Sequence, residues 1–200
     1  MKRLITYIAT TMFSCFVYAQ AVDSIKNKII IRDNGNAMEI TMGDSSVTIS
    51  YEFMYEKYLL NGVEKANDGN FESALADFNV ALLYITTDPQ AYYNKGLAYY
   101  YLKQYDMAIE NYNVAVELDS NYEEAYGQRG IVKSLSGDPE GAKTDFRKAI
   151  LIKPEKGLNY YNYGIALLVN DEIDEGCQQM IIALKLGYSD AENVILKYCH

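Results

Sequence analysis

Small and large apolar residues recur along the chain with a period of 34 residues between Tyr55 and Asp190. Each period holds two amphipathic helical patterns and a polar turn, with glycine, small residues, large apolar residues and tyrosine at fixed positions. The columns are Gly62, Gly96, Gly130 and Gly164; Ala74, Ala108, Ala142 and Gly176; Ala81, Ala115, Ala149 and Ala183; Phe78, Tyr112, Phe146 and Met180; and Tyr58, Tyr92, Tyr126 and Tyr160. Such a period predicts a solenoid of stacked helix pairs.

Four units follow one another without insertion, and turn residues mark their helix ends. In the first unit we expect the second helix to run from about Phe71 to Tyr84. Asp followed by Pro suits an N-cap and the first helical position. The predicted units are 55–88, 89–122, 123–156 and 157–190, within a domain of residues 51–200. The turn and capping signals are Asp68-Gly69-Asn70, Asp88-Pro89, Asp138-Pro139 and Asn170-Asp171.

These columns resemble the tetratricopeptide repeat, a helix-turn-helix unit with an aromatic residue at position 4, glycine at 8 and small residues at 20 and 27. The resemblance covers Tyr55 to Asp190. It implies an all-α fold: a right-handed solenoid of four helix pairs whose first helices line a concave face. Lys133 stands where the family often has tyrosine, Gly176 replaces an alanine, and only Pro154 matches the proline near the repeat end.

The repeated glycine needs a physical reason, because glycine inside a helix costs on the order of 1 kcal/mol relative to alanine. We expect the two helices of each unit to touch where glycine faces alanine, with the aromatic residues of positions 4 and 24 on either side. Replacing Gly96 or Gly130 by leucine is therefore expected to unfold the array.

The N-terminal residues have the order of a secretory signal. Lys2 and Arg3 precede an uncharged apolar run, and Val17-Tyr18-Ala19 precedes Gln20. This order predicts a signal peptide over residues 1–19 with cleavage after Ala19. The run is short for a membrane span. The alternative is lipidation at Cys15, which would hold the mature chain on a membrane surface as part of an assembly.

Residues 20–50 carry no 34-residue column and form a separate arm. Apolar runs at Ile29–Ile31, Ala37–Met42 and Val47–Ile49 predict two or three short strands, and Asn34-Gly35 is a strong hairpin signal. The arm is interpreted as a β-hairpin-like or partly ordered spacer. Alternatively, its unpaired edge adds a strand to a partner.

The C-terminal end predicts a capping helix at 190–199, in which Asp190 caps a helix from Ala191 to Tyr198. Cys177 and Cys199 lie nine residues on either side of the turn, so an antiparallel pair of helices brings them level. In an oxidising compartment this predicts a disulfide of roughly 3 kcal/mol. Two free thiols are the alternative. Small exported tetratricopeptide proteins of Gram-negative bacteria are similar in carrying a terminal Lys-Tyr-Cys.

Charge and chemistry exclude several function classes. The net charge is −9, so no basic face is expected for a nucleic acid. The single histidine, His200, leaves no buried histidine base or histidine metal cluster. Glu123-Glu124 and Asp171-Glu172 are interpreted as solvated caps at helix N-termini. The sequence therefore predicts a non-enzyme without cofactor, metal or small-molecule substrate.

A binding groove is the positive prediction. The resemblance places a set of side chains on the concave face, where amides of Asn94, Gln128 and Asn162 form a ladder that can pair with a peptide backbone. Its neighbours are tyrosine and aliphatic residues. The full set is Tyr93, Asn94, Leu97, Tyr100, Tyr101, Gln128, Ile131, Leu135, Tyr161, Asn162, Ile165 and Leu168. The family's carboxylate clamp needs cations where this chain has Glu124, Gln128 and Leu158, which disfavours an acidic C-terminal ligand.

The resulting hypothesis is an exported adaptor, periplasmic or secreted, that binds an extended peptide or a helix of an envelope or secretory protein. Alanine at Tyr93, Asn94 and Tyr161 is expected to abolish capture of that partner while leaving thermal stability nearly unchanged. Two alternatives stay open. The protein self-associates as a structural component of the envelope, or the groove packs against its own N-terminal arm or stays empty.

Overall fold

The computed structural model describes residues 29–42 and 45–199, so the expected signal peptide and Cys15 lie outside the described part of the chain. The chain divides into two compact units. The first is Met1–Tyr58 with Asn79–Thr86, and the second is Leu59–Phe78 with Thr87–His200. The second unit contains most of the repeats and both surfaces discussed below.

Within the first unit, residues 29–42 and 45–50 form a three-stranded antiparallel sheet in the order β1-β2-β3. The β1–β2 turn forms at the predicted Asn-Gly site, where Gly35 has a φ of 88°. The Asn34 side chain closes this turn by accepting hydrogen bonds from the backbone N–H groups of Asn36 and Ala37. The expected strands are thus confirmed. Their bounds are Ile29–Asp33 (β1), Ala37–Met42 (β2) and Ser45–Ser50 (β3).

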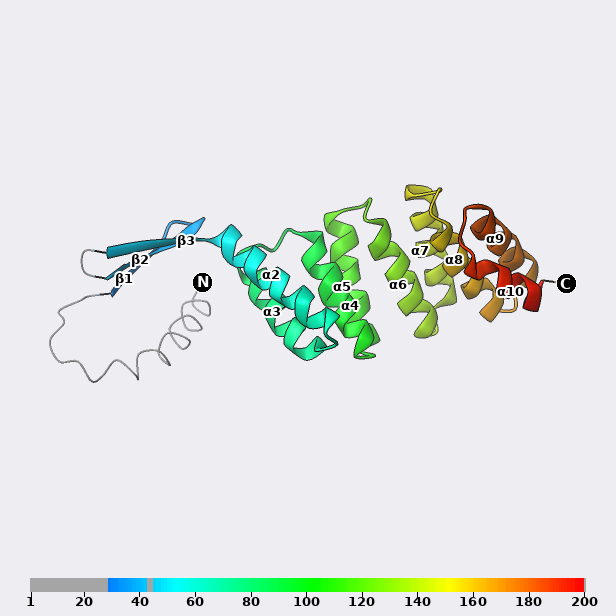
Figure 1. Ribbon diagram of the computed structural model, residues 1–200, viewed down its shortest axis with the longest axis horizontal. Coiled ribbons are helices and arrows are strands. Elements are labelled where there is room, and N and C mark those ends of the chain that lie inside the picture. The colour runs from blue at the N-terminus through cyan, green and yellow to red at the C-terminus, as the bar shows by residue number, and fades with distance from the viewer. Residues whose placement is uncertain (1–28, 43–44, 200) are drawn as a thin grey trace. The chain divides into compact units, whose positions relative to one another are not determined.

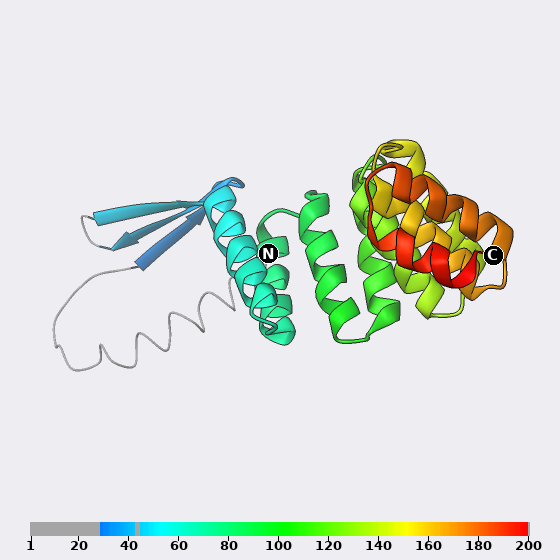
Figure 2. The same cartoon turned by 45° about the vertical axis from the view of Figure 1, so that its right-hand side comes forward.

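Nine helices follow in the described residues, which confirms an all-α array of four pairs and a last helix (Figure 1). We call α2, α4, α6 and α8 the A helices and α3, α5, α7 and α9 the B helices. Figure 2 shows α4 to α10 following one another in chain order. The bounds are Tyr51–Asn67 (α2), Phe71–Tyr84 (α3), Pro89–Tyr101 (α4), Tyr105–Leu118 (α5), Glu123–Leu135 (α6), Pro139–Ile152 (α7), Gly157–Val169 (α8), Ile173–Lys185 (α9) and Asp190–Tyr198 (α10).

The predicted Asp-Pro helix starts are confirmed. The Asp88 carboxylate accepts a hydrogen bond from the N–H of Gln90 at 2.7 Å, ahead of α4. Asp138 does the same for the N–H of Gly141 at 2.9 Å, ahead of α7. In both helices proline occupies the first turn, where its missing N–H has no helical partner to lose.

The four repeated glycines are buried inside helices, as expected, but their neighbour differs from the one predicted. A methyl group on Gly96 would lie 2.7 Å from a ring carbon of Tyr112, and one on Gly130 would lie 2.9 Å from Phe146. The residue of position 24, and not the alanine of position 20, therefore lies against the glycine. In the fourth pair the nearest neighbours include the facing backbone, with the carbonyl oxygen of Gly176 3.1 Å from a methyl on Gly164.

The last helix covers the end of the array through Ala191, which is fully buried against Met180 and Ala183 of α9. The helix begins at Asp190, and Ser189 before it makes no capping hydrogen bond, so the prediction that Asp190 is the N-cap is wrong by one residue. Cys177 and Cys199 are bonded in the structure, with Cα atoms 5.6 Å apart. Their pairing links the second turn of α9 to the residue that follows α10.

Candidate functional site

Two hollows open between neighbouring A helices of the second unit. The first hollow has a volume of about 330 Å³ and lies between the C-terminal half of α2 and α4, with the start of α3 at one side. Phe71 and Tyr101 stack there with ring centres 4.8 Å apart. The lining residues are Val63, Ala66, Asn67, Gly69, Phe71, Phe78, Asn94, Leu97, Ala98 and Tyr101.

The second hollow has a volume of about 370 Å³ and lies between α6 and α8, with one contribution from α7. The only polar side chains in its lining are a hydroxyl, a phenol and an amide, so it is chiefly apolar. The lining residues are Ile131, Ser134, Leu135, Phe146, Tyr161, Asn162, Ile165, Ala166 and Val169.

The structure divides the predicted groove residues into two groups and leaves some out. Asn94, Leu97 and Tyr101 line the first hollow. The second hollow takes Ile131, Leu135, Tyr161, Asn162 and Ile165. Gln128, the middle amide of the predicted ladder, lines neither hollow. Between the two hollows, larger side chains pack at the α4–α6 junction.

Tyr93 and Tyr100 are among those larger side chains. The ring of Tyr93 lies 5.9 Å from that of Tyr112 and 5.2 Å from that of Tyr122, and burial raises the pKa of Tyr93 to about 12. Tyr100 packs against a cluster that includes Val132 of α6. Both residues therefore join helices. Both are partly buried, so only part of each side chain is open to a ligand.

Tyr161 also has a packing role, since its ring lies 4.8 Å from that of Tyr188 at the α9–α10 turn. Alanine at Tyr93 or Tyr161 would remove ring contacts that hold helices together. The expectation that such variants keep nearly full stability is therefore corrected. Variants that test the surface must use residues whose side chains are free to change.

Asn94 carries an unused donor at the first hollow. Its Nδ2 atom is buried and has no hydrogen-bond partner among the described residues. Buried amides are nearly always paired, and an unpaired one costs roughly 1–3 kcal/mol. An acceptor supplied by a bound chain, such as a backbone carbonyl, would satisfy this donor.

The acidic residues at the start of α6 are ion-paired, which corrects their interpretation as solvated caps. Glu123 is only 1% exposed and lies 2.8 Å from Lys156 and 3.3 Å from Lys153. Glu124 lies 2.9 Å from Lys153. Partial burial alone would raise the pKa of Glu124, but the hydrogen bond from Lys153, a backbone hydrogen bond and the charges of Lys156 and Lys153 together lower the pKa to about 2.

The cations of the third unit are also engaged within the array. Arg129 donates two hydrogen bonds to the carboxylate of Asp145, at 2.8 and 2.6 Å, and a third to the side-chain oxygen of Asn113. Lys133 lies 2.9 Å from the same carboxylate. This contact explains why lysine stands where the family often has tyrosine: it balances a buried aspartate on the facing helix.

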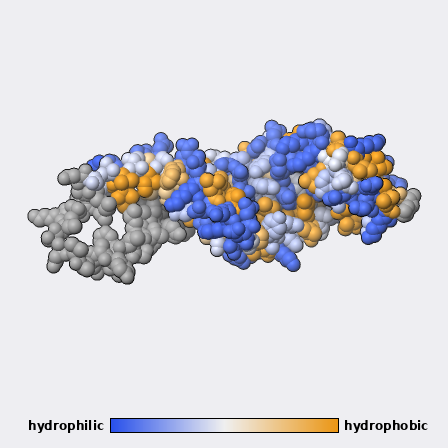
Figure 3. Space-filling model, viewed as in Figure 1, coloured by the Kyte–Doolittle hydropathy of each residue, from blue (hydrophilic) through white to orange (hydrophobic). Residues whose placement is uncertain are grey.

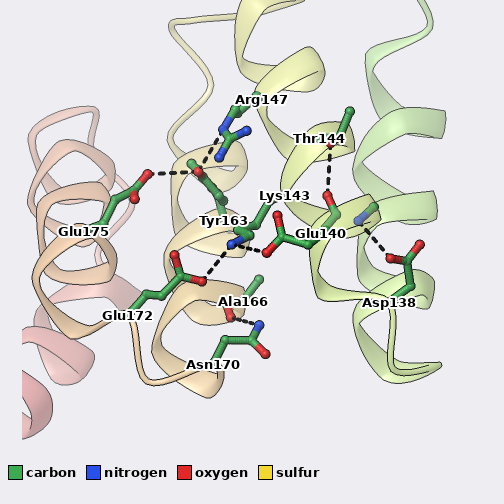
Figure 4. Close-up of polar contacts among 11 residues, drawn as sticks. Asp138, Glu140, Lys143, Thr144, Arg147, Tyr163, Ala166, Asn170, Glu172 and Glu175 are labelled. Atoms are coloured by element: carbon green, nitrogen blue, oxygen red, sulfur yellow. Dashed lines mark hydrogen bonds and ion pairs between the residues drawn. The ribbon is translucent and has the colours of Figure 1, made fainter.

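A further polar network joins α7, α8 and α9 (Figure 4). Lys143 lies between Glu140 at 2.6 Å and Glu172 at 2.9 Å, so Glu172 is also paired and not a free cap. The Tyr163 hydroxyl accepts from Arg147 and donates to Glu175. These charges serve the joints between repeats. Among the described residues, those that line the two hollows carry no charge.

A membrane span and a metal site are both absent from the described residues. None of the helices there is long and apolar enough to cross a bilayer. The same part of the chain contains no group of three or more histidine, cysteine, aspartate and glutamate side chains placed to hold a metal ion.

The fold and repeat pattern define a class of helical repeat scaffolds, and comparison with known proteins names the family. The tetratricopeptide repeat family matches residues 89–122 and, through a second model, residues 123–156. These matches show tetratricopeptide repeats over residues 89–156, and the helix pairs on either side continue the same pattern. Repeats of this family are generally not catalytic.

Relatives and solved structures agree with that assignment. Small glutamine-rich tetratricopeptide repeat-containing protein 2 of Saccharomyces cerevisiae is 26% identical over 49% of this chain and 28% of its own length. The chain thus spans under a third of that relative. The crystal structure of MamA has a TM-score of 0.64 and 25% identity, covering 72% of this chain and 88% of its own.

A second similar structure contains a bound peptide. The second tetratricopeptide domain of human RPAP3, in complex with the HSP70 peptide SGPTIEEVD, has a TM-score of 0.57 and 20% identity. It covers 58% of this chain and 98% of its own. At this identity the likeness concerns the fold alone.

Some lining residues were not anticipated from the sequence. Phe71, Ala66, Ser134 and Val169 line hollows but were not in the predicted set. Two of them, Ala66 and Ser134, share position 12 of their units, where Tyr100 and Leu168 stand in the other two. That difference in size along one column was the signal that could have located the hollows.

Proposed function

We propose that this protein is a non-enzymatic scaffold that binds a segment of a partner protein on the face formed by its A helices. The observation that carries the proposal is the pair of uncharged hollows between A helices, the first with an unpaired buried amide donor at Asn94. Apolar hollows can bind the apolar side chains of a partner segment, and amide side chains can pair with the backbone of that segment where it is extended.

The lining also favours a type of partner. The carboxylate of an acidic peptide tail needs cations, as in charge-assisted recognition generally. The HSP70 peptide SGPTIEEVD of the RPAP3 complex contains three acidic residues. The lining of the two hollows offers no cation, and Lys153 and Lys156, in the turn between α7 and α8, already pair with Glu123 and Glu124. An apolar, uncharged segment is the better match.

Export belongs to the same proposal. It is supported by the charge order of residues 1–19 and by the Cys177–Cys199 pair, which suits an oxidising compartment. We therefore propose a partner in the envelope or the secretory pathway, met in the periplasm or outside the cell.

Photo-crosslinking in the native host tests the binding face. A benzophenone amino acid replaces Tyr101 or Leu135 on the A helices, and in matched controls it replaces Leu118 or Leu151 on the B helices. All four side chains are exposed. We expect a discrete adduct from Tyr101 and Leu135 but none from the two controls. Adducts from the B-helix positions alone would contradict the proposal.

A second candidate function is self-association through the sheet. Ile31, Ile40 and Val47 are consecutive partners across the three strands and so share one face, where Ile31 is 46% and Val47 is 56% exposed. An exposed apolar sheet face suits pairing with a copy of itself. Light scattering at high concentration separates the candidates: Val47→Lys and removal of residues 20–50 should both reduce the mass. A monomeric parent chain would exclude self-association.

A further inference from the structure

The two hollows are the same site built twice. Eight lining residues of the first hollow have a counterpart in the second hollow 68 residues later, which is two periods of 34. Asn94 corresponds to Asn162, and Leu97 corresponds to Ile165. Each hollow thus presents one asparagine beside aliphatic side chains.

The cause is the size of one side chain in each A helix. Position 12 holds Ala66 in the first unit and Ser134 in the third, and both line a hollow. In the second unit the same position holds Tyr100, which packs against the cluster of Ala108, Tyr112 and Val132. In the fourth unit it holds Leu168, which packs with Met180 of α9. Small residues leave space, and large ones fill it.

An independent feature has the same alternation. In the first unit, Lys65 at position 11 pairs with Asp77 at position 23, at 2.5 Å. In the third unit, Lys133 and Asp145 occupy the same two positions and are also in contact. The second unit has Tyr99 and Asn111 at these positions. The Lys–Asp ion pairs and the hollows therefore both recur in every second unit. These features repeat with a period of two units.

We infer that the two hollows are equivalent subsites for one extended, uncharged segment that carries two apolar side chains. This inference rests on the proposed function and specifies its ligand. Neighbouring helices pack about 8–10 Å apart, so hollows two repeats apart are separated by about 20 Å. An extended chain advances about 3.3 Å per residue, which places the two apolar side chains about six residues apart.

The amides favour an extended segment over a helix. Within a helix the backbone carbonyls are already bonded to N–H groups four residues on, so they are poor acceptors for Asn94 and Asn162. An extended segment leaves those carbonyls free. The uncharged lining, in a chain of net charge −9, gives no reason for the segment to carry charge between its apolar residues.

Filling each hollow separately tests this inference. A library of random 12-residue peptides displayed on phage is selected on the full chain, and enriched peptides are synthesised and titrated by fluorescence anisotropy. Ala66→Tyr adds a tyrosine ring to the first hollow, and Ser134→Tyr adds one to the second. Tyr100 already supplies such a ring at the α4–α6 junction between the two hollows. Ser120→Tyr, in the exposed turn before α6, adds the same ring elsewhere. Circular dichroism melts confirm that each variant folds.

Enriched peptides are expected to hold two apolar residues five to seven positions apart and few acidic ones. Ala66→Tyr and Ser134→Tyr should each weaken binding at least tenfold, while Ser120→Tyr leaves it unchanged. Peptides with one apolar residue, or peptides weakened by only one of the two hollow variants, would overturn the two-subsite inference and leave the proposed binding face intact. Absence of any enriched peptide would overturn the proposed function and the inference together.

Discussion

At the scale of single residues, the position-24 side chains explain the glycine column. The rings of Phe78, Tyr112 and Phe146 lie so close to the glycines of the facing helices that no methyl group fits between them. Since Tyr112 is fully buried, its ring has no free space into which it could move. In these three pairs, the close contact that requires glycine is therefore between an aromatic ring and the backbone of the facing helix, and not between two small residues.

Gly96→Ala is expected to lower stability by about 1–3 kcal/mol, because the new methyl would lie 2.7 Å from Tyr112. Gly127→Ala is the matched control. Gly127 also lies in an A helix, has open space around it, and should gain up to about 1 kcal/mol from helix propensity. Thermal melts followed by circular dichroism measure both. Equal effects of the two substitutions would show that the ring contact does not restrict the site.

At the scale of elements, ion pairs and the disulfide hold the joints between helices. Glu123 and Glu124 at the start of α6 bind Lys153 and Lys156 in the turn between α7 and α8. The sequence indicated the caps but not these pairs, because their partners lie about 30 residues away and only the stacking of repeats brings them together. The Asp-Pro helix starts, which depend on adjacent residues alone, were predictable.

Glu124→Gln tests the joint through pH. The pKa of Glu124 in the folded chain, about 2, lies below its ordinary value of 4.5, so the pair stabilises the fold above pH 4.5 and loses this effect as pH falls towards 2. The Glu124 side chain is 39% exposed, so solvent screens the pair and we expect a stabilisation of only about 1 kcal/mol. Melts should show a deficit for the variant at pH 7 that shrinks below pH 4.5 and is lost as pH reaches about 2. Glu155→Gln, an exposed neighbour, is the control. A deficit that keeps the same size from pH 7 down to pH 2 would contradict the ion pair.

The Cys177–Cys199 link should hold α10 in place. Nine residues are too few for a helix to persist alone, and closing a loop of this length contributes roughly 3 kcal/mol. Cys177→Ser, or reduction of the parent chain, should therefore speed hydrogen exchange of the α10 amides much more than that of α5. If α10 exchanges at the same rate with and without the link, the last helix is held by its apolar contacts alone.

At the scale of the whole molecule, the repeat period predicted the four helix pairs, the last helix and the class of function. It did not predict the division of the groove. The family resemblance placed Tyr93 and Tyr100 on the inward face, but whether a large inward side chain stays open or packs at a junction depends on its neighbours in the next repeat. Tyr122 and Val132 supply that packing, and neither is near in sequence to the residue that it covers.

The central claim is that a partner segment lies on the A helices and occupies both hollows. The most direct measurement follows the side-chain amide signals of Asn94 and Asn162 by nuclear magnetic resonance while a selected peptide is added to the isotope-labelled chain. We predict that both signals shift together and saturate at one peptide per chain, while signals of exposed B-helix residues such as Leu151 stay in place. Shifts confined to B helices, with both asparagine signals unmoved, would contradict the account.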